Sequence, residues 1–216
     1  MGKTTFYIVR HGESLGNATG VLLGRTDLDL SELGHRQAAA TAEALRNVHF
    51  DKIYSSKLIR AYNTALPHAQ LRGMDIIPDA ELMEVMIGKW EGKRGEDIIK
   101  TWPDAFTPDW YKNYGTYTYP GGESNIHAAE RFYNEVVRIA ENNPNSCILI
   151  ASHAAVIRGF WAILTGSPHE DVGLETEFPS NASYSVCEYE NGRITPLQYS
   201  CDNHLAGVGI TTIKFN

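Results

Sequence analysis

The sequence predicts an α/β fold, arranged as a three-layer α/β/α sandwich around a largely parallel central sheet with an antiparallel edge strand. Two short apolar stretches are typical of buried parallel strands, segments of helical periodicity alternate with them, and a turn dipeptide late in the chain separates two further strand-like stretches. Strands that alternate with helices form right-handed β-α-β units, which place helices on both faces of one sheet. We therefore expect residues 1–216 to form a single domain.

The first half of the chain contains two predicted strands and two predicted helices. Thr5–Val9 is rich in β-branched and aromatic residues, which favours a buried strand. Ser31 can cap a helix over His35–Arg46, where alanine and other strong helix formers dominate. Phe50–Tyr54 is expected to form the second strand and Ser56–Leu71 the second helix.

The second half repeats this alternation and then departs from it. Ser124–Glu141 is amphipathic with a helical period, Cys147–Ala151 is a wholly apolar strand, and Ala155–Leu164 is expected to be helical. Asn191-Gly192 is a dipeptide favoured in tight hairpin turns, so we expect an antiparallel hairpin at the sheet edge. The two strands of this hairpin are Tyr184–Glu190 and Arg193–Tyr199.

An aromatic segment bounded by prolines interrupts the alternation and is expected to be a lid-like insertion at about residues 93–123. Its aromatic residues are Trp102, Phe106, Trp110, Tyr111, Tyr114, Tyr117 and Tyr119. These side chains could stack on a ring or an apolar part of a ligand, or they could only pack the insertion itself. The sequence leaves both interpretations open.

Composition argues against several classes of protein. The formal net charge of −7 opposes nucleic acid as a partner, because backbone binding depends on clustered lysine and arginine. No apolar run approaches the roughly 20 residues that span a bilayer, so we expect no membrane association. Cys147, Cys187 and Cys201 are odd in number and widely separated, which opposes a disulfide framework or a zinc knuckle. We therefore expect a cytoplasmic protein with reduced thiols.

Histidine follows both of the predicted buried strands. Arg10 and His11 come directly after the first strand, and His153 follows the strand that ends at Ala151. In open α/β sheets, ligands bind at the carboxyl ends of the strands, near a switch in strand order. A lone histidine at a strand end is more often structural, whereas two of them beside an arginine favour a shared functional site.

Six segments carry residues that recur together in one known family. They are Val9–Ser14 with Asn17, Gly24-Arg25-Thr26-Asp27 through Gln37-Ala38, Ser55–Ala61, Leu82-Met83-Glu84 with Gly88–Gly92, Gly121–Ser124, and Ile150–His153. In this order they resemble the motifs of the histidine phosphatase superfamily, which includes the cofactor-dependent phosphoglycerate mutases. An Arg-His-Gly triplet occurs by chance, but six ordered motifs over nearly the whole chain are specific. The resemblance implies a phosphoglycerate mutase-like fold.

The resemblance also implies a reaction through a phosphorylated histidine. His11, as the neutral imidazole, would attack phosphorus with one ring nitrogen while the other donates a hydrogen bond that fixes the tautomer. Arg10 and Arg60 would disfavour the imidazolium by charge repulsion and would bind the phosphoryl oxygens. His153 and Asn17 would donate hydrogen bonds to the phosphoryl group as its charge is redistributed.

Glu84 matches the acid/base residue of the family. It would protonate the leaving oxygen and later activate water, which requires a raised pKa. Ala154 stands where many members have glycine, and only its backbone N–H would bind phosphate. Ser14, Gly24 and Arg25 are expected to contact the substrate, although a structural role suits them equally well.

Metal chemistry is the main alternative for the histidines. Zinc sites usually show close pairs such as H-E-x-x-H or C-x-x-C, and the sequence contains neither. Gly121–Ser124 lacks the lysine of a P-loop, which leaves nucleotide binding of that type unsupported. We therefore expect neither a metal ion nor a cofactor. Five further histidines are expected at the surface: His35, His49, His68, His127 and His169.

Family membership leaves the reaction open, because phosphohistidine serves both hydrolysis and isomerisation. The phosphoglycerate mutases of the family carry an arginine pair and a lysine-bearing insertion, whereas Thr101–Tyr119 offers Lys112 but no arginine. We therefore expect a phosphatase for a small phosphorylated metabolite, either of broad specificity or similar to α-ribazole phosphatases. A phosphoglycerate mutase is the alternative. A non-catalytic binder of phosphorylated ligands would be expected to lose His11 or Glu84, and a homodimer stays open.

Overall fold

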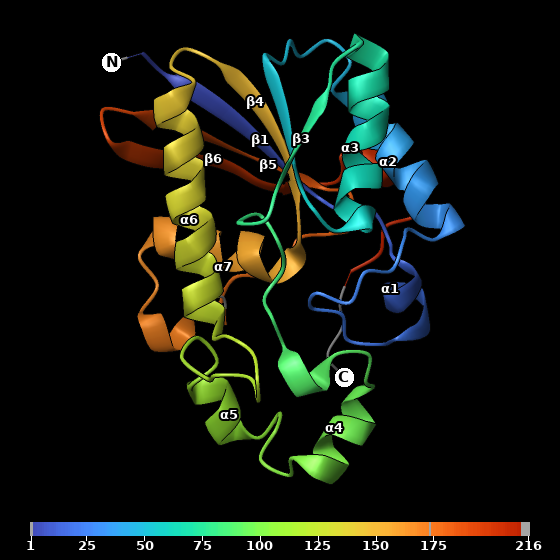
Figure 1. Ribbon diagram of the computed structural model, residues 1–216, viewed down its shortest axis with the longest axis vertical. Coiled ribbons are helices and arrows are strands. Elements are labelled where there is room, and N and C mark those ends of the chain that lie inside the picture. Colours follow the sequence, from blue (N-terminus) through green and yellow to red (C-terminus); the bar gives the residue numbers. More distant parts are fainter. Residues whose placement is uncertain (1, 173, 213–216) are drawn as a thin grey trace.

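A six-stranded sheet forms the centre of the computed structural model, which describes residues 2–172 and 174–212 (Figure 1). The strand order is β3-β2-β4-β1-β5-β6. The strands are β1 (Thr4–Arg10), β2 (Lys52–Ser56), β3 (Ile76–Asp79), β4 (Cys147–Ser152), β5 (Tyr184–Glu190) and β6 (Arg193–Cys201). Strands β1 to β4 pair in parallel, whereas β5 is antiparallel to β1 and β6 to β5. The predicted α/β class and mixed sheet are therefore confirmed.

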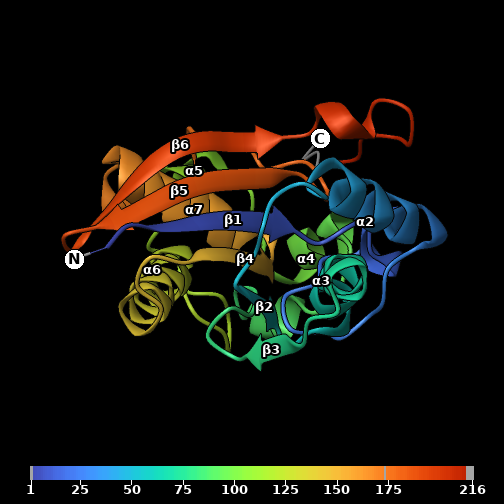
Figure 2. The same cartoon turned by 90° about the horizontal axis from the view of Figure 1, so that it is seen from above.

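The helices cover both faces of this sheet, with α2 and α3 on one side and α6 and α7 on the other (Figure 2). Ser31 caps α2 by accepting a hydrogen bond from the Gly34 N–H at 3.0 Å, as the sequence predicts. The α-helices are α1 (Leu15–Thr19), α2 (Glu32–Ala44), α3 (Ile59–Arg72), α4 (Gly95–Thr101), α5 (Pro108–Lys112), α6 (Asn125–Asn142) and α7 (Ala154–Thr165). Single-turn 3₁₀ helices occupy Gly88–Trp90, His169–Asp171 and Asn203–Leu205.

The two central strands are buried on both faces because their alternate side chains enter separate cores. Phe6 and Ile8 of β1 pack with α6 and α7, whereas Val9 packs on the α2 and α3 side. Ile150 and Ala151 of β4 divide between the two cores in the same way. A strand in this position is apolar at every residue, which explains the continuous apolar runs in the sequence.

The antiparallel hairpin forms where the sequence predicts it. Asn191 and Gly192 have φ values of 53° and 79°, the left-handed backbone that two-residue hairpin turns need. The sequence did not predict β3, whose four residues include Pro78. Proline cannot donate a ladder hydrogen bond, and β3 tolerates it because this strand lies at the sheet edge.

The aromatic insertion is a small helical layer below the carboxyl ends of the strands, where α4 and α5 lie (Figure 1). It packs around Trp90, which is completely buried. The Trp90 ring centroid lies 5.3 Å from that of Phe106, 6.1 Å from that of Trp110 and 5.1 Å from that of Tyr119. Most aromatics of the segment therefore build its own core.

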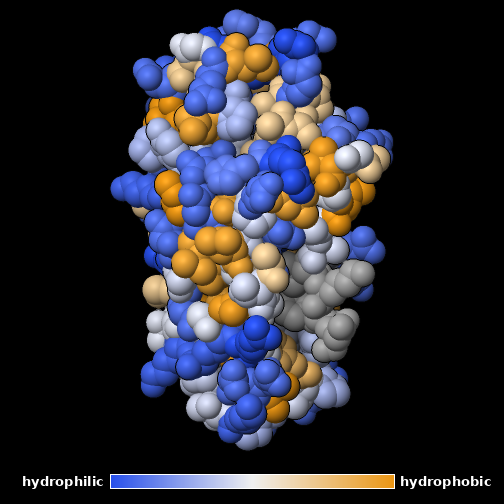
Figure 3. Space-filling model, turned by 90° about the vertical axis from the view of Figure 1, so that its right-hand side faces the viewer, coloured by the Kyte–Doolittle hydropathy of each residue, from blue (hydrophilic) through white to orange (hydrophobic). Residues whose placement is uncertain are grey.

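The surface in Figure 3 carries hydrophobic residues in separate patches between hydrophilic ones. The large hydrophobic residues that are exposed come from different parts of the chain: Leu15, Leu28, Leu71, Ile99, Leu197 and Ile210. Within residues 2–172 and 174–212, no helix has the length and apolar character that a membrane crossing requires.

The prediction that five further histidines lie at the surface is wrong for His68. His35, His49, His127 and His169 are exposed, but His68 is completely buried and packs edge-on against Phe50. The reason is helical spacing, because Ala61, Thr64, Ala65, His68 and Ala69 form one buried stripe of α3. Burial, and then the charge of Arg72, lowers the pKa of His68 to about 3.

Burial of His68 in its neutral form makes stability sensitive to acid. In the unfolded chain, His68 has a pKa of about 6.5 and binds a proton below that pH, whereas the folded protein keeps it neutral. Each unit of pH decrease below about 6.5 therefore lowers the free energy of unfolding by about 1.4 kcal/mol. Urea denaturation of wild type and His68→Leu at pH 7 and pH 5 measures this effect. We expect wild type to lose about 2 kcal/mol more free energy of unfolding than the variant. Equal losses would contradict the neutral, buried state of His68.

Candidate active site

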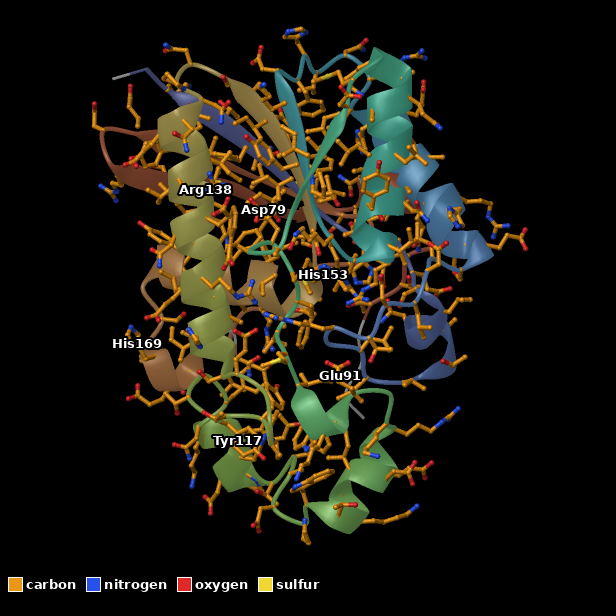
Figure 4. The ribbon with its side chains drawn as sticks, in the orientation of Figure 1. Asp79, Glu91, Tyr117, Arg138, His153 and His169 are labelled. Carbon is orange, nitrogen blue, oxygen red and sulfur yellow. The ribbon has the colours of Figure 1, made fainter. Side chains whose placement is uncertain are left out.

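The site forms where β1 and β4 end side by side. The parallel register pairs Arg10 with Ser152, and the N–H of His11 donates to the Ser152 carbonyl at 2.9 Å. The next residue along β4 is His153, whose ring centroid lies 5.2 Å from that of His11. In Figure 4, His153 lies at the end of β4, between the sheet and the part of the chain that carries Glu91 and Tyr117. The two strand-end histidines therefore share one site, as predicted.

His11 is held in one tautomer. Its Nδ1 lies 2.7 Å from the carbonyl oxygen of Gly12, and because a carbonyl only accepts, Nδ1 carries the proton and Nε2 carries the lone pair. The ring is 5% exposed. Burial, followed by the charges of Arg60 and Arg10, holds the pKa of His11 well below its usual range. The imidazole is therefore neutral at physiological pH, with Nε2 available as a nucleophile.

Arg10 and Arg60 are completely buried and their guanidinium groups are fixed by backbone carbonyls. Arg10 Nη1 donates to the Pro179 carbonyl. Arg60 donates from Nη1 to the Thr26 carbonyl at 2.9 Å and from Nη2 to the Gly24 carbonyl at 2.7 Å. Burial lowers the pKa of Arg10 to about 10 and also lowers that of Arg60, yet both groups stay charged near neutral pH. The site is thus strongly positive in a protein of net negative charge.

Three buried nitrogens beside His11 have no hydrogen-bond partner in the described part of the chain: Arg10 Nε, Arg60 Nε and His153 Nδ1. The opposite nitrogen of His153, Nε2, lies 2.7 Å from the Ser56 hydroxyl. Leaving buried polar nitrogens unpaired is costly unless a ligand supplies partners. Phosphoryl oxygens have the charge and the lone pairs that the two guanidinium groups need.

Glu84 lies at the amino end of α7 and is 6% exposed. Its Oε2 accepts from the Ala155 N–H at 3.1 Å, and its Oε1 accepts from Val156 at 3.2 Å and Val85 at 2.9 Å. Burial raises the pKa of Glu84, while these backbone hydrogen bonds and Arg60 oppose the rise. Ala154, the first residue of α7, is buried and lines the same cavity.

Asn17 lies in α1, and Ser14 is the residue that caps the amino end of this helix. The Ser14 hydroxyl accepts from the Asn17 N–H at 3.1 Å, and Asn17 Oδ1 accepts from the Ser14 N–H and from Asn181 Nδ2, both at 3.2 Å. Because these two contacts use Asn17 Oδ1, its Nδ2 remains as the donor that could bind a ligand. The predicted contact with a phosphoryl oxygen requires such a donor. Ser14 is completely buried and serves as a helix cap.

Gly24 and Arg25 lie beside the site and are tied to the protein by Glu91, a residue for which the sequence analysis named no role. The Glu91 carboxylate accepts from the N–H groups of Gly24, Arg25 and Thr26 at 3.0, 2.7 and 3.0 Å, and from the Thr26 hydroxyl at 2.7 Å. Because Gly24 and Thr26 hold Arg60, Glu91 fixes that arginine indirectly. Its place in the Gly88–Gly92 motif was the available signal.

A cavity of about 710 Å³ opens from this cluster. Arg10, His11, Arg60 and Glu84 line its inner end. Its outer wall comes from the loop after α1, from Ile87 and from the aromatic insertion, and includes Leu22, Ile99, Phe106, Tyr111, Tyr114 and Tyr119. The insertion therefore both packs on itself and covers the site, so the two interpretations of its aromatics are compatible. Among the described residues, no group of three or more histidine, cysteine, aspartate or glutamate side chains is placed to hold a metal ion.

Comparisons with known proteins agree with this geometry. A phosphoserine phosphatase 1 from Hydrogenobacter thermophilus is 32% identical over 199 residues, which is 92% of each chain. A metal-independent phosphoserine phosphatase from Arabidopsis thaliana is 28% identical and covers 99% of this chain and 88% of its own. The solved mycobacterial glucosyl-3-phosphoglycerate phosphatase superposes with a TM-score of 0.83 at 26% identity, over 93% of this chain and all of its own. The family model of the histidine phosphatase superfamily, branch 1, matches residues 6–202, and the chain belongs to that family.

Proposed function

We propose that this enzyme is a metal-independent phosphatase that hydrolyses a small phosphomonoester through a phosphohistidine at His11. The observation that carries the proposal is the His11 imidazole, neutral and fixed by Gly12, between two buried guanidinium groups. Such a ring has a free Nε2 lone pair next to the charges that bind a phosphoryl dianion.

The reaction has two steps. In the first, His11 Nε2 bonds to phosphorus, the bond from phosphorus to the ester oxygen breaks, and the protonated Glu84 carboxyl gives its proton to that oxygen. In the second, Glu84, now ionised, takes a proton from water while the water oxygen bonds to phosphorus and the P–N bond breaks. Arg10 and Arg60 neutralise the phosphoryl oxygens in both steps. Inorganic phosphate and the alcohol are the products.

The cavity lining favours hydrolysis of an ester whose alcohol carries no carboxylate. Arg10 and Arg60 are the cations among the described lining residues, and both lie at the phosphate end. Towards the opening, the charged lining residue is Glu96, which would repel a carboxylate. Arg158 lines an adjoining cavity, but it donates to the Leu174 and Thr176 carbonyls. A phosphoglycerate mutase must hold a carboxylate through two orientations, so hydrolysis of an apolar or aromatic ester fits this lining better.

A substrate panel tests the proposal. We expect release of inorganic phosphate from phenyl and p-nitrophenyl phosphate, with a kcat/KM about tenfold or more above that for phosphoserine, since a lost carboxylate partner costs at least about 1.4 kcal/mol. Incubation of 3-phosphoglycerate with bisphosphoglycerate should give no 2-phosphoglycerate. A chelator should leave all rates unchanged, because the arginines supply the positive charge.

Other outcomes would select another function. Isomerisation faster than hydrolysis would identify a mutase. A strict requirement for a divalent ion would contradict the metal-independent route, and silence on the whole panel would favour a non-catalytic binder. A preference for phosphoserine, the substrate named for two of the relatives, would overturn the inference from the cavity lining while leaving the phosphatase assignment in place.

A further inference from the structure

We infer that Glu123, with Arg131 and Arg25, is a positioning residue that holds the segment carrying the general acid Glu84. The inference rests on the proposed function, because it concerns how the acid of that reaction is placed. Glu123 belongs to the Gly121–Ser124 motif, none of whose four residues lines the cavity. Its carboxylate is nevertheless buried, with 8% of it exposed.

The segment that carries Glu84 lacks the hydrogen bonds of a regular element. Residues 81–87 run between β3 and the 3₁₀ helix Gly88–Trp90 without helix or strand. Leu82, Val85 and Ile87 are nevertheless buried together with Glu84. Buried backbone groups outside regular structure must find side-chain partners. The position of this segment is therefore set by the side chains that bind its carbonyl and N–H groups.

Arg131 of α6 binds three of the carbonyl groups of this segment. Its Nη1 donates to the carbonyls of Glu81 at 2.6 Å and Met83 at 3.0 Å. Its Nη2 contacts the Glu84 carbonyl at 3.4 Å and donates to Glu123 Oε1 at 3.0 Å. The side chain of Arg131 is 12% exposed. One largely buried guanidinium thus spans three carbonyls around the acid.

Glu123 binds the same segment from the other side, and we call Glu123, Arg131 and Arg25 together the bracket. Its Oε1 accepts from the Met86 N–H at 3.0 Å and from Arg25 Nη2 at 3.2 Å, in addition to Arg131. Its own N–H donates to the Met86 carbonyl at 2.9 Å, so both backbone groups of Met86 are paired with Glu123. This contact needs Gly122, where a Cβ would lie 2.0 Å from the Met86 carbonyl oxygen.

These contacts of the bracket reach the chemistry through the backbone of Glu84. Arg25 Nε also reaches the Glu84 carbonyl at 3.4 Å, so both guanidinium groups that Glu123 neutralises bind the backbone of the acid. Without the charge of Glu123, two cations lose their counter-charge, and an uncharged side chain binds them and the Met86 N–H less strongly. Proton transfer requires hydrogen-bond reach, and a displacement of about 1 Å can cost about 100-fold in rate.

The experiment compares two esters of similar shape that differ in leaving group. Phenyl phosphate needs a proton on its leaving oxygen, whereas nitrophenolate leaves far more readily without one. For Glu123→Gln, we expect kcat/KM to fall by about 100-fold on phenyl phosphate. On p-nitrophenyl phosphate we expect a loss of about tenfold or less. Competitive inhibition by inorganic phosphate should stay unchanged. In a Glu84→Gln background, Glu123→Gln should cause no further loss, because the group it positions is gone.

Glu135→Gln is the matched control. Glu135 lies in α6. Like Glu123, it is a buried carboxylate that pairs with an arginine, Arg138, at 2.8 Å, but it is not bonded to residues 81–86. Its substitution should affect the two esters equally. If Glu123→Gln folds poorly by circular dichroism, Arg25→Gln replaces it, because Arg25 is one-third exposed and bonds both Glu123 and the Glu84 carbonyl. Its loss should show the same dependence on the leaving group.

The two proposals fail in different ways. Equal losses on both esters, or an undiminished effect of Glu123→Gln in the Glu84→Gln background, would overturn the positioning role while wild type remains a phosphatase. A wild-type chain that hydrolyses neither ester would remove the proposed function, and the positioning role with it.

Discussion

Replacing His11 with alanine is expected to lower kcat/KM by about 10⁴-fold or more, because the covalent step loses its nucleophile. The Gly12 carbonyl and the neighbouring arginines hold the ring for attack through Nε2, and none of the other groups at the inner end of the cavity is a comparable nucleophile. Rapid quenching with labelled substrate should give an acid-labile, alkali-stable phosphoprotein in wild type and none in the variant.

His35→Ala is a suitable control, since His35 is exposed and outside the site. It should retain wild-type rates and labelling. Phosphate release by His11→Ala at a rate near that of wild type would remove the phosphohistidine from the mechanism, even if the chain proved to be a phosphatase by another route.

Replacing Glu84 with glutamine is expected to lower kcat/KM for phenyl phosphate by about 10²- to 10⁴-fold, the usual contribution of a general acid. The loss should be smaller with p-nitrophenyl phosphate. Because the same residue also activates water, the phosphoenzyme should accumulate in the variant. Quench-flow measurement of phosphoenzyme and product separates the two steps. A uniform loss across leaving groups, without accumulation, would contradict the acid/base role.

The pH profile of wild type gives a second check on Glu84. Burial raises the pKa of Glu84, and an acid must be protonated to donate, so kcat/KM should fall as pH rises through that pKa. The pKa of His11 is held well below its usual range by burial, so the loss of the neutral nucleophile should appear only at clearly acidic pH. Glu84→Gln should abolish the alkaline limb and leave the acidic limb in place.

Much of the fold could be predicted from the sequence, because the spacing of apolar residues follows which side chains are buried. The apolar runs of β1 and β4 and the Asn191-Gly192 turn fixed the centre and one edge of the sheet. The sequence did not predict strand β3, because an edge strand of four residues that contains a proline shows no clear alternation of apolar and polar residues. The prediction for His68 was wrong because its polar side chain suggested the surface, whereas its position in the α3 stripe buries it.

The residues of the site also fall into those that the sequence predicted and those that it did not. The sequence identified His11, Arg60 and Glu84 through their motifs, but it assigned no task to Glu91 or Glu123. A carboxylate that binds backbone N–H groups or arginines leaves no pattern of its own, since its partners lie far along the chain. Glu91 holds residues 24–26, and Glu123 holds the segment around Glu84.

By itself, the sequence determined the α/β class, the strand ends that carry the histidines and the groups proposed to bind phosphate, because these depend on local periodicity and residue type. The tertiary structure decided the His11 tautomer, the pKa directions of His11 and Glu84, the dual role of the aromatic insertion and the carboxylates that support the site. Each of these depends on burial and on distances between residues remote in the chain, which a linear pattern does not encode.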